Sequence, residues 1–302
     1  MTDYFEKVTA ECGAAYRELA GKMEGILPST LCFESLLAWE KACHVSYQIV
    51  EDYFCVLVQD TIKKKQYLYM PIGQYQIESL ERLMDKLFAQ QGSFCRSLLF
   101  CDVAEEQLEY LKQLKGYRIR MKSSRGYSDY IYSMEDFEKS LSASEARYNR
   151  NYFIRKYRPE CRSMNSGDGP VCDAVVERSF CQYHDCRECV DGCLKDTIGL
   201  LLENYDDSVV KGVMVQIGEL SVGYAVGVLQ GDTFVFLFKK NCREYRGLSE
   251  YLHWKIAELV RGRAQVINYT EDMNLEGLRK YKEKLAPYQL RPKYKVEVER
   301  LR

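Results

Sequence analysis

The segment CQYHDCRECVDGC, residues 181–193, has residue types that suit metal binding. Thiolates and imidazole are the preferred ligands of zinc, and a Cys-x2-Cys pair lies beside a third cysteine and a histidine here. However, no second Cys-x2-Cys follows at zinc-ribbon distance, and the three cysteines repeat at i, i+3 and i+7, the spacing of one helix face. We therefore predict core packing in preference to a metal site. The candidate ligands are His184, Cys186, Cys189 and Cys193.

The neighbouring acids Glu271 and Asp272 are candidates for a general base. They follow Thr270 at the expected start of a helix, where acidic side chains also stabilise the positive end of the helix dipole. The chain's three histidines have no persuasive partner for a nucleophilic triad. The pair is therefore a catalytic candidate with a simpler structural alternative, helix capping.

A basic segment lies near the middle of the chain, with no acidic residue between positions 147 and 158. Basic side chains interleaved with tyrosines can bind a polyanion by counterion release. The formal net charge of the whole chain is −1, which argues against a generally basic nucleic-acid-binding protein. Apolar residues also fall on one helical face, so we predict an amphipathic connecting helix whose basic edge faces an interdomain cleft. The cleft candidates are Arg147, Arg150, Asn151 and, from a later helix, Arg279.

The bulk composition is that of a two-domain globular protein. The chain has 302 residues, 46% of them apolar, which is enough for two cores of ordinary size. No run approaches about 20 consecutive apolar residues, and the N-terminus has no secretory leader. The thirteen cysteines, an odd number, are expected to be reduced thiols used as small hydrophobic residues. We therefore expect a cytoplasmic protein without a transmembrane segment.

The pattern of apolar residues predicts the same order of elements in each half of the chain. The second half has three strand-like runs joined by short polar turns, which indicates an antiparallel meander followed by helix, strand, helix and strand. The first half repeats this order, which favours duplicated domains of mixed, mostly antiparallel sheets flanked by helices. The expected ranges are 1–140 for the first domain, 141–165 for a basic connecting helix and 166–302 for the second domain. In the second half, the predicted elements are strands 210–218, 220–230, 232–240, 264–269 and 288–301, and helices 245–261 and 271–285.

This order of elements resembles that of the GNAT acyltransferase fold, and two segments make the resemblance more specific. The segment INYTEDMNLEGLRKYKEKLAPYQLRPKY, residues 267–294, resembles the C-terminal signature of an uncharacterised bacterial family. That family is related to the C-terminal domain of phosphatidylglycerol lysyltransferase, which has two GNAT-like domains in tandem. The segment from Asp129 to Tyr157 resembles the family's Asp-Tyr-(Val/Ile)-Tyr strand and the basic helix after it.

The resemblance implies a place for an acyl donor. In GNAT domains the donor lies between two splayed central strands, with its pyrophosphate at the start of the helix that follows. In this chain that place is KKNCREYRGLSEYLHW, residues 239–254. A glycine there lets a phosphate approach the backbone, although the usual acetyl-CoA signature matches poorly. The implied donor- or anion-binding residues are Lys239, Lys240, Arg243, Arg246, Gly247 and Ser249.

The function expected from these observations is acyl or aminoacyl transfer. The donor, acyl-CoA or aminoacyl-tRNA, is a substrate of the second domain and not a tightly bound cofactor, and tRNA is thus a possible partner. The acceptor, a small molecule or a lipid, is expected in the interdomain cleft. Two family positions differ here: Phe238 stands where an acid is expected, and Leu285-Ala286-Pro287 replaces Tyr-His-Pro. A non-catalytic tandem-GNAT scaffold therefore remains an alternative, and a metal-binding regulator a weaker one.

Overall fold

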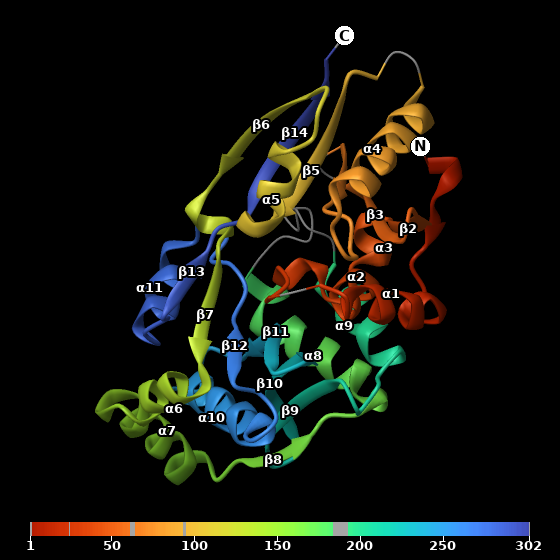
Figure 1. Ribbon diagram of the computed structural model, residues 1–302. Helices are drawn as coiled ribbons and strands as arrows, with labels where there is room; N and C mark the ends of the chain where they lie inside the picture. Colours follow the sequence, from red (N-terminus) through yellow and green to blue (C-terminus); the bar gives the residue numbers. More distant parts are fainter. Residues whose placement is uncertain (1, 24, 61–63, 93–94, 184–192, 302) are drawn as a thin grey trace. The chain divides into compact units, whose positions relative to one another are not determined.

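The protein forms two mixed units, each a sheet flanked by helices (Figure 1). Its computed structural model describes residues 2–23, 25–60, 64–92, 95–183 and 193–301. We call Met1–Tyr127 with Arg291–Arg302 the N-terminal unit, and Ser128–Leu290 the C-terminal unit. The predicted α+β class with two mixed sheets is therefore confirmed.

The N-terminal unit has the strand order β1-β2-β3-β4-β5-β14-β6. Its pairs are antiparallel except β4 with β5, as expected when a helix connects two neighbouring strands. Its elements are β1 Glu6–Lys7, α1 Gly13–Ala20, α2 Phe33–Ala38, α3 Glu40–Cys43, β2 Val45–Val50, β3 Tyr53–Asp60, β4 Lys65–Tyr69, α4 Ile77–Gln91, β5 Ser97–Val103, α5 Glu105–Lys112, β6 Tyr117–Ser123 and β14 Tyr294–Arg300.

Both faces of the first sheet are buried at β3, where successive side chains enter two different cores. Tyr53 and Leu57 belong to the core under α4, whereas Phe54 and Val56 belong to the core under α1 and α2. This alternation is the period of two expected for a strand. The helix α4 has buried leucines and other apolar residues at i, i+3, i+4, i+7 and i+8, which explains why this segment forms an amphipathic helix.

The C-terminal unit has the strand order β13-β7-β12-β11-β10-β9-β8. The strands β9, β10 and β11 form the predicted meander, and β12 lies parallel to β11. Its elements are β7 Asp129–Ser133, α6 Met134–Ser142, α7 Ser144–Tyr157, β8 Glu160–Ser163, α8 Gly169–Ser179, α9 Leu194–Glu203, β9 Val210–Ile217, β10 Leu220–Gln230, β11 Thr233–Asn241, α10 Leu248–Val260, β12 Val266–Asn268, α11 Glu276–Lys284 and β13 Gln289–Arg291.

The two halves of the sequence exchange one strand each. The strand β7 follows the N-terminal meander in sequence but pairs with β12 in the C-terminal unit. Conversely, β14 at the end of the chain lies between β5 and β6 of the N-terminal unit, where Val296 and Val298 are fully buried. The compact units therefore differ from the ranges 1–140 and 166–302. Alternating hydrophobicity predicts that a strand has a buried face, but it does not specify which sheet supplies its hydrogen-bonding neighbours.

Two predicted elements of the second half have other boundaries in the structure. The helix expected from residue 271 begins at Glu276, because residues 270–275 form a loop in which Thr270, Met273 and Asn274 have positive φ values. The single strand expected over 288–301 is divided into β13 and β14, which lie in different sheets. The predictions of the three meander strands were correct to within one residue at each end.

Candidate functional site

The strands β11 and β12 diverge after a short parallel pairing in the C-terminal unit. Only Thr233–Val235 of β11 pair with β12, whereas β11 stays paired with β10 as far as Asn241. We call the region beyond this parallel pairing the strand fork. The rings of Phe236 and Tyr269 lie 4.5 Å apart there. The fork has the position that the GNAT resemblance implies for a donor.

A β-bulge in β11 decides which side chains face the fork. Val226 of β10 pairs with Phe238, but the next residue, Gly227, pairs with Phe236, so Leu237 is an extra residue. Bulges reverse the alternation of a strand and are frequent beside active sites. As a result Lys239 points to the same side as Phe236, toward α10, whereas unbroken alternation would place them on opposite faces.

Five polar side chains form one continuous hydrogen-bonded chain on this side of the sheet, which we call the Lys239–Tyr269 chain. Lys239 Nζ donates to Ser249 Oγ at 2.6 Å, and Ser249 Oγ donates to the Tyr281 hydroxyl at 3.1 Å. The Tyr281 hydroxyl lies 2.7 Å from His253 Nδ1, and His253 Nε2 lies 2.7 Å from the Tyr269 hydroxyl. Three elements, β11, α10 and α11, and the segment after β12 thus contribute to one hydrogen-bonded arrangement.

Burial changes the proton affinity of two members of this chain. The half-buried Lys239 has its pKa lowered to about 7, chiefly by burial, with Lys282 lowering it further against an opposing effect of Glu250. His253 is fully buried, and its pKa lies well below the usual value because of burial and the nearby Lys239 and Lys282. A lysine amine that is substantially neutral at pH 7 can accept a proton, and the neutral imidazole can link the two tyrosines.

Asp272, one of the two candidate general bases, is bound on all sides by hydrogen-bond donors. Its fully buried carboxylate accepts hydrogen bonds from Arg279 Nε at 2.9 Å, from the Tyr130 hydroxyl at 2.6 Å and from the Asn274 N–H at 2.8 Å. Burial raises the pKa of Asp272, but these hydrogen bonds outweigh it and lower the pKa to about 2. Such a carboxylate is a poor base at neutral pH. Glu271 accepts a hydrogen bond from Lys282 Nζ through its main-chain oxygen at 2.8 Å.

We expect Asp272→Ala to destabilise the C-terminal unit by about 2–3 kcal/mol at pH 7, because it leaves Arg279 and Tyr130 without their acceptor. The folded pKa of about 2 lies below the unfolded value near 3.8. The stabilisation by Asp272 is therefore complete above about pH 4 and is lost as the pH falls through 2. Urea unfolding at pH 7 and at pH 2.5 measures this, with the exposed Glu276→Ala as control. An equal effect of Asp272→Ala at both pH values would contradict the prediction.

The other residues of the signature segment also hold the loop before α11. Lys282 is buried and donates to the main-chain oxygen atoms of Tyr269 and Glu271. Asn268 donates to Asp129 Oδ2 at 3.0 Å and accepts from the Thr270 N–H at 2.9 Å. The signature thus fixes the backbone on which Tyr269 and Tyr281 are carried. The four-residue spacing of Ser249 and His253 on one helix was a sequence signal that could have revealed part of the site.

The six predicted donor-binding residues do not converge on one point. Lys239 and Ser249 are hydrogen-bonded to each other, but Lys240 Nζ lies over the Phe180 ring at 4.5 Å and Arg243 over the Tyr183 ring at 4.7 Å. The guanidinium of Arg246 lies over two tyrosine rings of α7. The role of Gly247 in the structure is close packing, because an added Cβ would lie 2.1 Å from the Asn149 carbonyl oxygen.

The four cleft candidates all belong to the C-terminal unit. Arg147 and Asn151 are exposed on α7, whereas Arg150 is half-buried with its guanidinium 4.6 Å from the centre of the Trp254 ring. Arg279 pairs with Asp272. The apolar face of α7 contains the fully buried Phe153 and packs on the core of this unit. That α7 is amphipathic is therefore confirmed, while its place in an interdomain cleft stays a prediction.

Of the candidate metal ligands, for which core packing was the preferred prediction, His184, Cys186 and Cys189 lie outside the described residues. Cys193 is exposed and precedes α9. Over the ranges given above, no three His, Cys, Asp or Glu side chains gather as a metal site would require. Similarly, within these ranges we find no helix with the length and apolar character needed to cross a bilayer.

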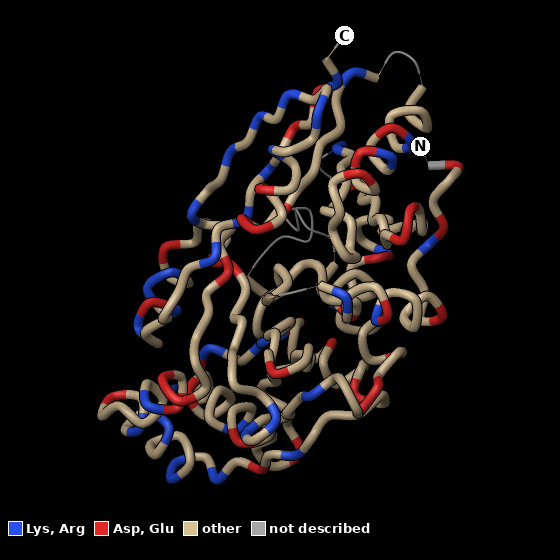
Figure 2. Tube along the Cα trace, in the orientation of Figure 1, with Lys and Arg blue, Asp and Glu red and all other residues tan. Residues whose placement is uncertain are grey.

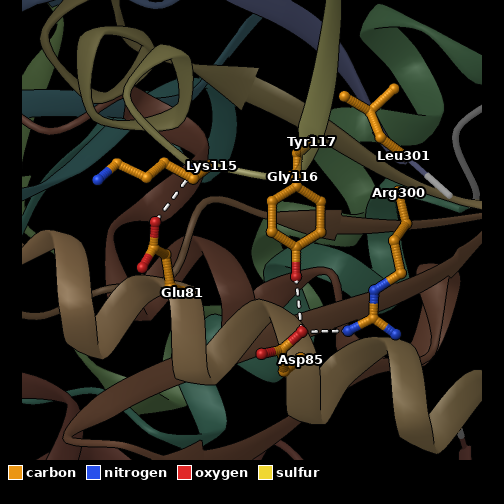
Figure 3. Close-up of a pocket in the computed structure, with 7 residues that line it drawn as sticks. All are labelled: Glu81, Asp85, Lys115, Gly116, Tyr117, Arg300 and Leu301. Atoms are coloured by element: carbon orange, nitrogen blue, oxygen red, sulfur yellow. Dashed lines mark hydrogen bonds and ion pairs between the residues drawn. The ribbon is translucent and has the colours of Figure 1, made fainter.

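A surface hollow of about 270 Å³ lies in the N-terminal unit (Figure 3). Asp85 is its central polar group, and it accepts a hydrogen bond from the Tyr117 hydroxyl at 2.9 Å and pairs with Arg300. Glu81 accepts from the Lys115 N–H at 3.1 Å. These contacts pair the acidic groups of the hollow with neighbouring donors.

The profile of the family described as phosphatidylglycerol lysyltransferase, C-terminal, matches residues 27–297. The chain belongs to this family. The resemblance seen in the two sequence segments is therefore confirmed. No protein with curated annotation is significantly similar to this member of the phosphatidylglycerol lysyltransferase C-terminal family.

Solved structures share the fold of this phosphatidylglycerol lysyltransferase C-terminal family member. A conserved protein of unknown function from Bacteroides thetaiotaomicron has 18% identity and a TM-score of 0.82, covering 98% of this chain and 99% of its own. The C-terminal domain of a putative lysylphosphatidylglycerol synthetase from Agrobacterium fabrum has 15% identity and a TM-score of 0.65, covering 96% and 92%. A tandem GNAT protein from the clavulanic acid biosynthesis pathway has 9% identity and a TM-score of 0.51, covering 97% of each. The tandem GNAT-like fold is thus established.

Proposed function

We propose that this protein is an acyl- or aminoacyltransferase whose C-terminal unit binds the acyl donor at the strand fork. The observation that carries the proposal is Lys239, whose pKa of about 7 and hydrogen bond to Ser249 make it a proton acceptor at the fork. Family membership supports an activated acyl ester as donor, either acyl-CoA or aminoacyl-tRNA. It also supports an acceptor with a hydroxyl or amino group, such as a lipid headgroup.

In the proposed reaction the acceptor oxygen or nitrogen attacks the acyl carbon of the donor. A new bond forms at that carbon, and the bond to the ester oxygen or thioester sulfur breaks. The neutral amine of Lys239 takes the proton that the acceptor loses and passes it to the leaving oxygen or sulfur, so that protons balance over the cycle. Ser249 holds the amine in position, and the rest of the Lys239–Tyr269 chain holds Ser249.

A donor screen tests the proposal directly. Acetyl-CoA, a long-chain acyl-CoA and lysyl-tRNA are added separately, and the thermal midpoint of the full chain is measured, since a ligand of the folded state must raise it. A donor that raises the midpoint is then incubated with phosphatidylglycerol vesicles, and acyl transfer to lipid is measured by mass spectrometry. A donor present at about 1,000 times its Kd stabilises the folded state by about 4 kcal/mol, so the transferase proposal is rejected if no donor raises the midpoint.

The rate of transfer should depend on pH through Lys239. Only the neutral amine accepts a proton, so we expect kcat/KM to rise about tenfold per pH unit below pH 7 and to level off above it. The direction follows from the pKa, since protonation at low pH removes the acceptor. Initial rates from pH 5 to pH 9 measure the profile. A rate that falls across this range as the pH rises would be inconsistent with Lys239 as the proton acceptor.

A second candidate is a tandem-GNAT binding scaffold without catalysis. The observation that favours it is the contact between the Phe236 and Tyr269 rings at the fork. In addition, Phe238 is buried at the position expected to be acidic. A scaffold binds its ligand without turnover. Donor binding without transfer to any tested acceptor, together with unchanged binding in Lys239→Met, is the result that supports it.

A further inference from the structure

The outward-facing side of α7 has two adjacent stripes of side chains four residues apart. Arg147, Asn151 and Arg155 form the first stripe, and Tyr148, Tyr152 and Lys156 form the second, because residues i, i+4 and i+8 lie above one another on a helix. We call these six residues, with Arg246, the α7 basic face. Figure 2 shows basic residues recurring along α7. Each stripe extends for about 12 Å along the helix axis.

The positive charge of the α7 basic face is largely uncompensated. From residue 144 to residue 158 the sequence has five basic residues and one acid, Glu145, in a chain of net charge −1. That acid pairs with Lys284 at 2.6 Å. Within the part of the chain that the structure describes, Arg147, Arg155 and Arg158 make no ion pair. Concentrated and unpaired charge of this kind suits the regularly spaced phosphates of a nucleic acid.

Tyrosine rings are interleaved with the charges. Tyr148 is 55% exposed, and the guanidinium of Arg246 lies 5.6 Å from its ring centre and 5.5 Å from that of Tyr152. Lys156 Nζ donates to the Tyr152 hydroxyl at 2.9 Å. The cation–π contacts hold these basic groups against the tyrosine rings. Exposed aromatic rings beside a basic track are the arrangement that stacks unpaired bases and binds the phosphates between them.

The buried side of α7 argues against a membrane as the partner. A helix that lies in a bilayer surface inserts its apolar face. The apolar residues of α7 are already used, because Phe153 is fully buried and Ile154 and Tyr157 pack on the same core. The exposed side offers tyrosines and charged groups and no large aliphatic side chain.

We propose that the α7 basic face is a binding surface for single-stranded nucleic acid, with phosphates held by Arg147 and Arg155 and a base stacked on Tyr148. This surface lies on α7 and not at the strand fork, and its binding of nucleic acid is measured separately from acyl transfer, whether the donor is acyl-CoA or aminoacyl-tRNA. It lies beside the start of α10, since Asn149 Nδ2 donates to Glu250 at 3.2 Å and Arg246 Nε donates to Asn149 Oδ1 at 3.1 Å.

Fluorescence anisotropy of a labelled 12-nucleotide RNA, and of DNA of the same sequence, tests the proposal with the full chain over a salt series. We expect binding at low salt, a loss of about 5- to 100-fold in Tyr148→Ala, and no change in the control Tyr4→Ala, which removes a similarly exposed tyrosine in the N-terminal unit. In the double variant Arg147→Ala/Arg155→Ala, the slope of log K against the logarithm of the salt concentration should become shallower by about 0.7 per lost phosphate contact.

Three results would overturn the proposal. The first is no binding of either oligonucleotide at low salt, and the second is oligonucleotide binding by the variants equal to that of the wild type. The third is that the variants lose binding only to anionic phosphatidylglycerol–phosphatidylcholine vesicles and keep their binding to the oligonucleotides. A stronger response to RNA than to DNA identifies the natural ligand class. Lys239→Met should bind the oligonucleotide like the wild type, so a failure of the transferase proposal is distinguishable from a failure of this one. Unchanged thermal midpoints of the variants exclude unfolding as the cause.

Discussion

Lys239→Met is expected to lower the rate of acyl transfer by about 10²- to 10⁴-fold, the usual contribution of a positioned proton acceptor. Methionine keeps the length of the side chain but cannot accept a proton or donate to Ser249. Transfer from the donor identified by the thermal screen, measured under single-turnover conditions, gives the size of the loss. The matched control is Lys255→Met, which removes another half-buried lysine of the same unit that lies over the Trp254 ring.

The same variant should change the pH dependence of stability. In the folded protein the pKa of Lys239 is about 7, whereas an unfolded lysine titrates near 10.5. Between these values the unfolded chain binds more protons, so the contribution of Lys239 to stability improves as the pH rises from 7 to 10.5. We therefore expect the thermal midpoint of Lys239→Met to exceed that of the wild type most at pH 7 and least at pH 10.

For the activity measurement, full transfer activity in Lys239→Met would reject the catalytic role of Lys239.

Gly247→Ala is expected to destabilise the C-terminal unit by about 3–5 kcal/mol, because two effects add. Gly247 has φ of +89°, a left-handed conformation that costs an L-residue about 1–2 kcal/mol. In addition, the new Cβ would lie 2.1 Å from the Asn149 carbonyl oxygen. This oxygen belongs to the backbone of α7, so it cannot rotate away as a side chain could. The helices α7 and α10 must therefore move apart.

Gly231→Ala separates these two effects. Gly231 has φ of +57°, but an added Cβ meets nothing within 4 Å, so only the conformational cost of about 1–2 kcal/mol is expected. Urea unfolding followed by Trp254 fluorescence in a Trp39→Phe background reports on the C-terminal unit, since Trp254 lies on α10. Equal destabilisation by the two alanine substitutions would mean that the close approach of Gly247 to α7 contributes nothing.

Much of the order of elements could be predicted because local patterns encode it. The runs around Val213, Tyr224 and Phe236 are rich in β-branched and aromatic residues and are separated by polar turns, and they form the meander as expected. Helix ends were less predictable. Thr270 and the acids after it have the composition of a helix start, yet Asp272 is bound by Arg279 and Tyr130, which hold the chain in a loop until Glu276.

The candidate site was predicted in part. Lys239 and Ser249 were identified from the resemblance to GNAT domains, but the roles of His253, Tyr269 and Tyr281 were not. Their side chains come from α10, the end of β12 and α11, and a hydrogen bond between residues 16 or 28 positions apart leaves no periodic signal. The prediction that Gly247 contributes to an anion site could likewise take no account of the close approach of Gly247 to Asn149, which exists only in the folded chain.

Local sequence therefore determined the secondary structure and the family, because hydrophobic period, turn residues and the signature segment act over short distances. Only the tertiary structure decided which sheet receives β7 and β14, since each strand has a buried face that either sheet could cover. It also decided the side on which Lys239 lies, because the bulge at Leu237 reverses the alternation of β11. The pKa of Lys239 follows from that placement, since burial and neighbouring charges exist only in the folded chain.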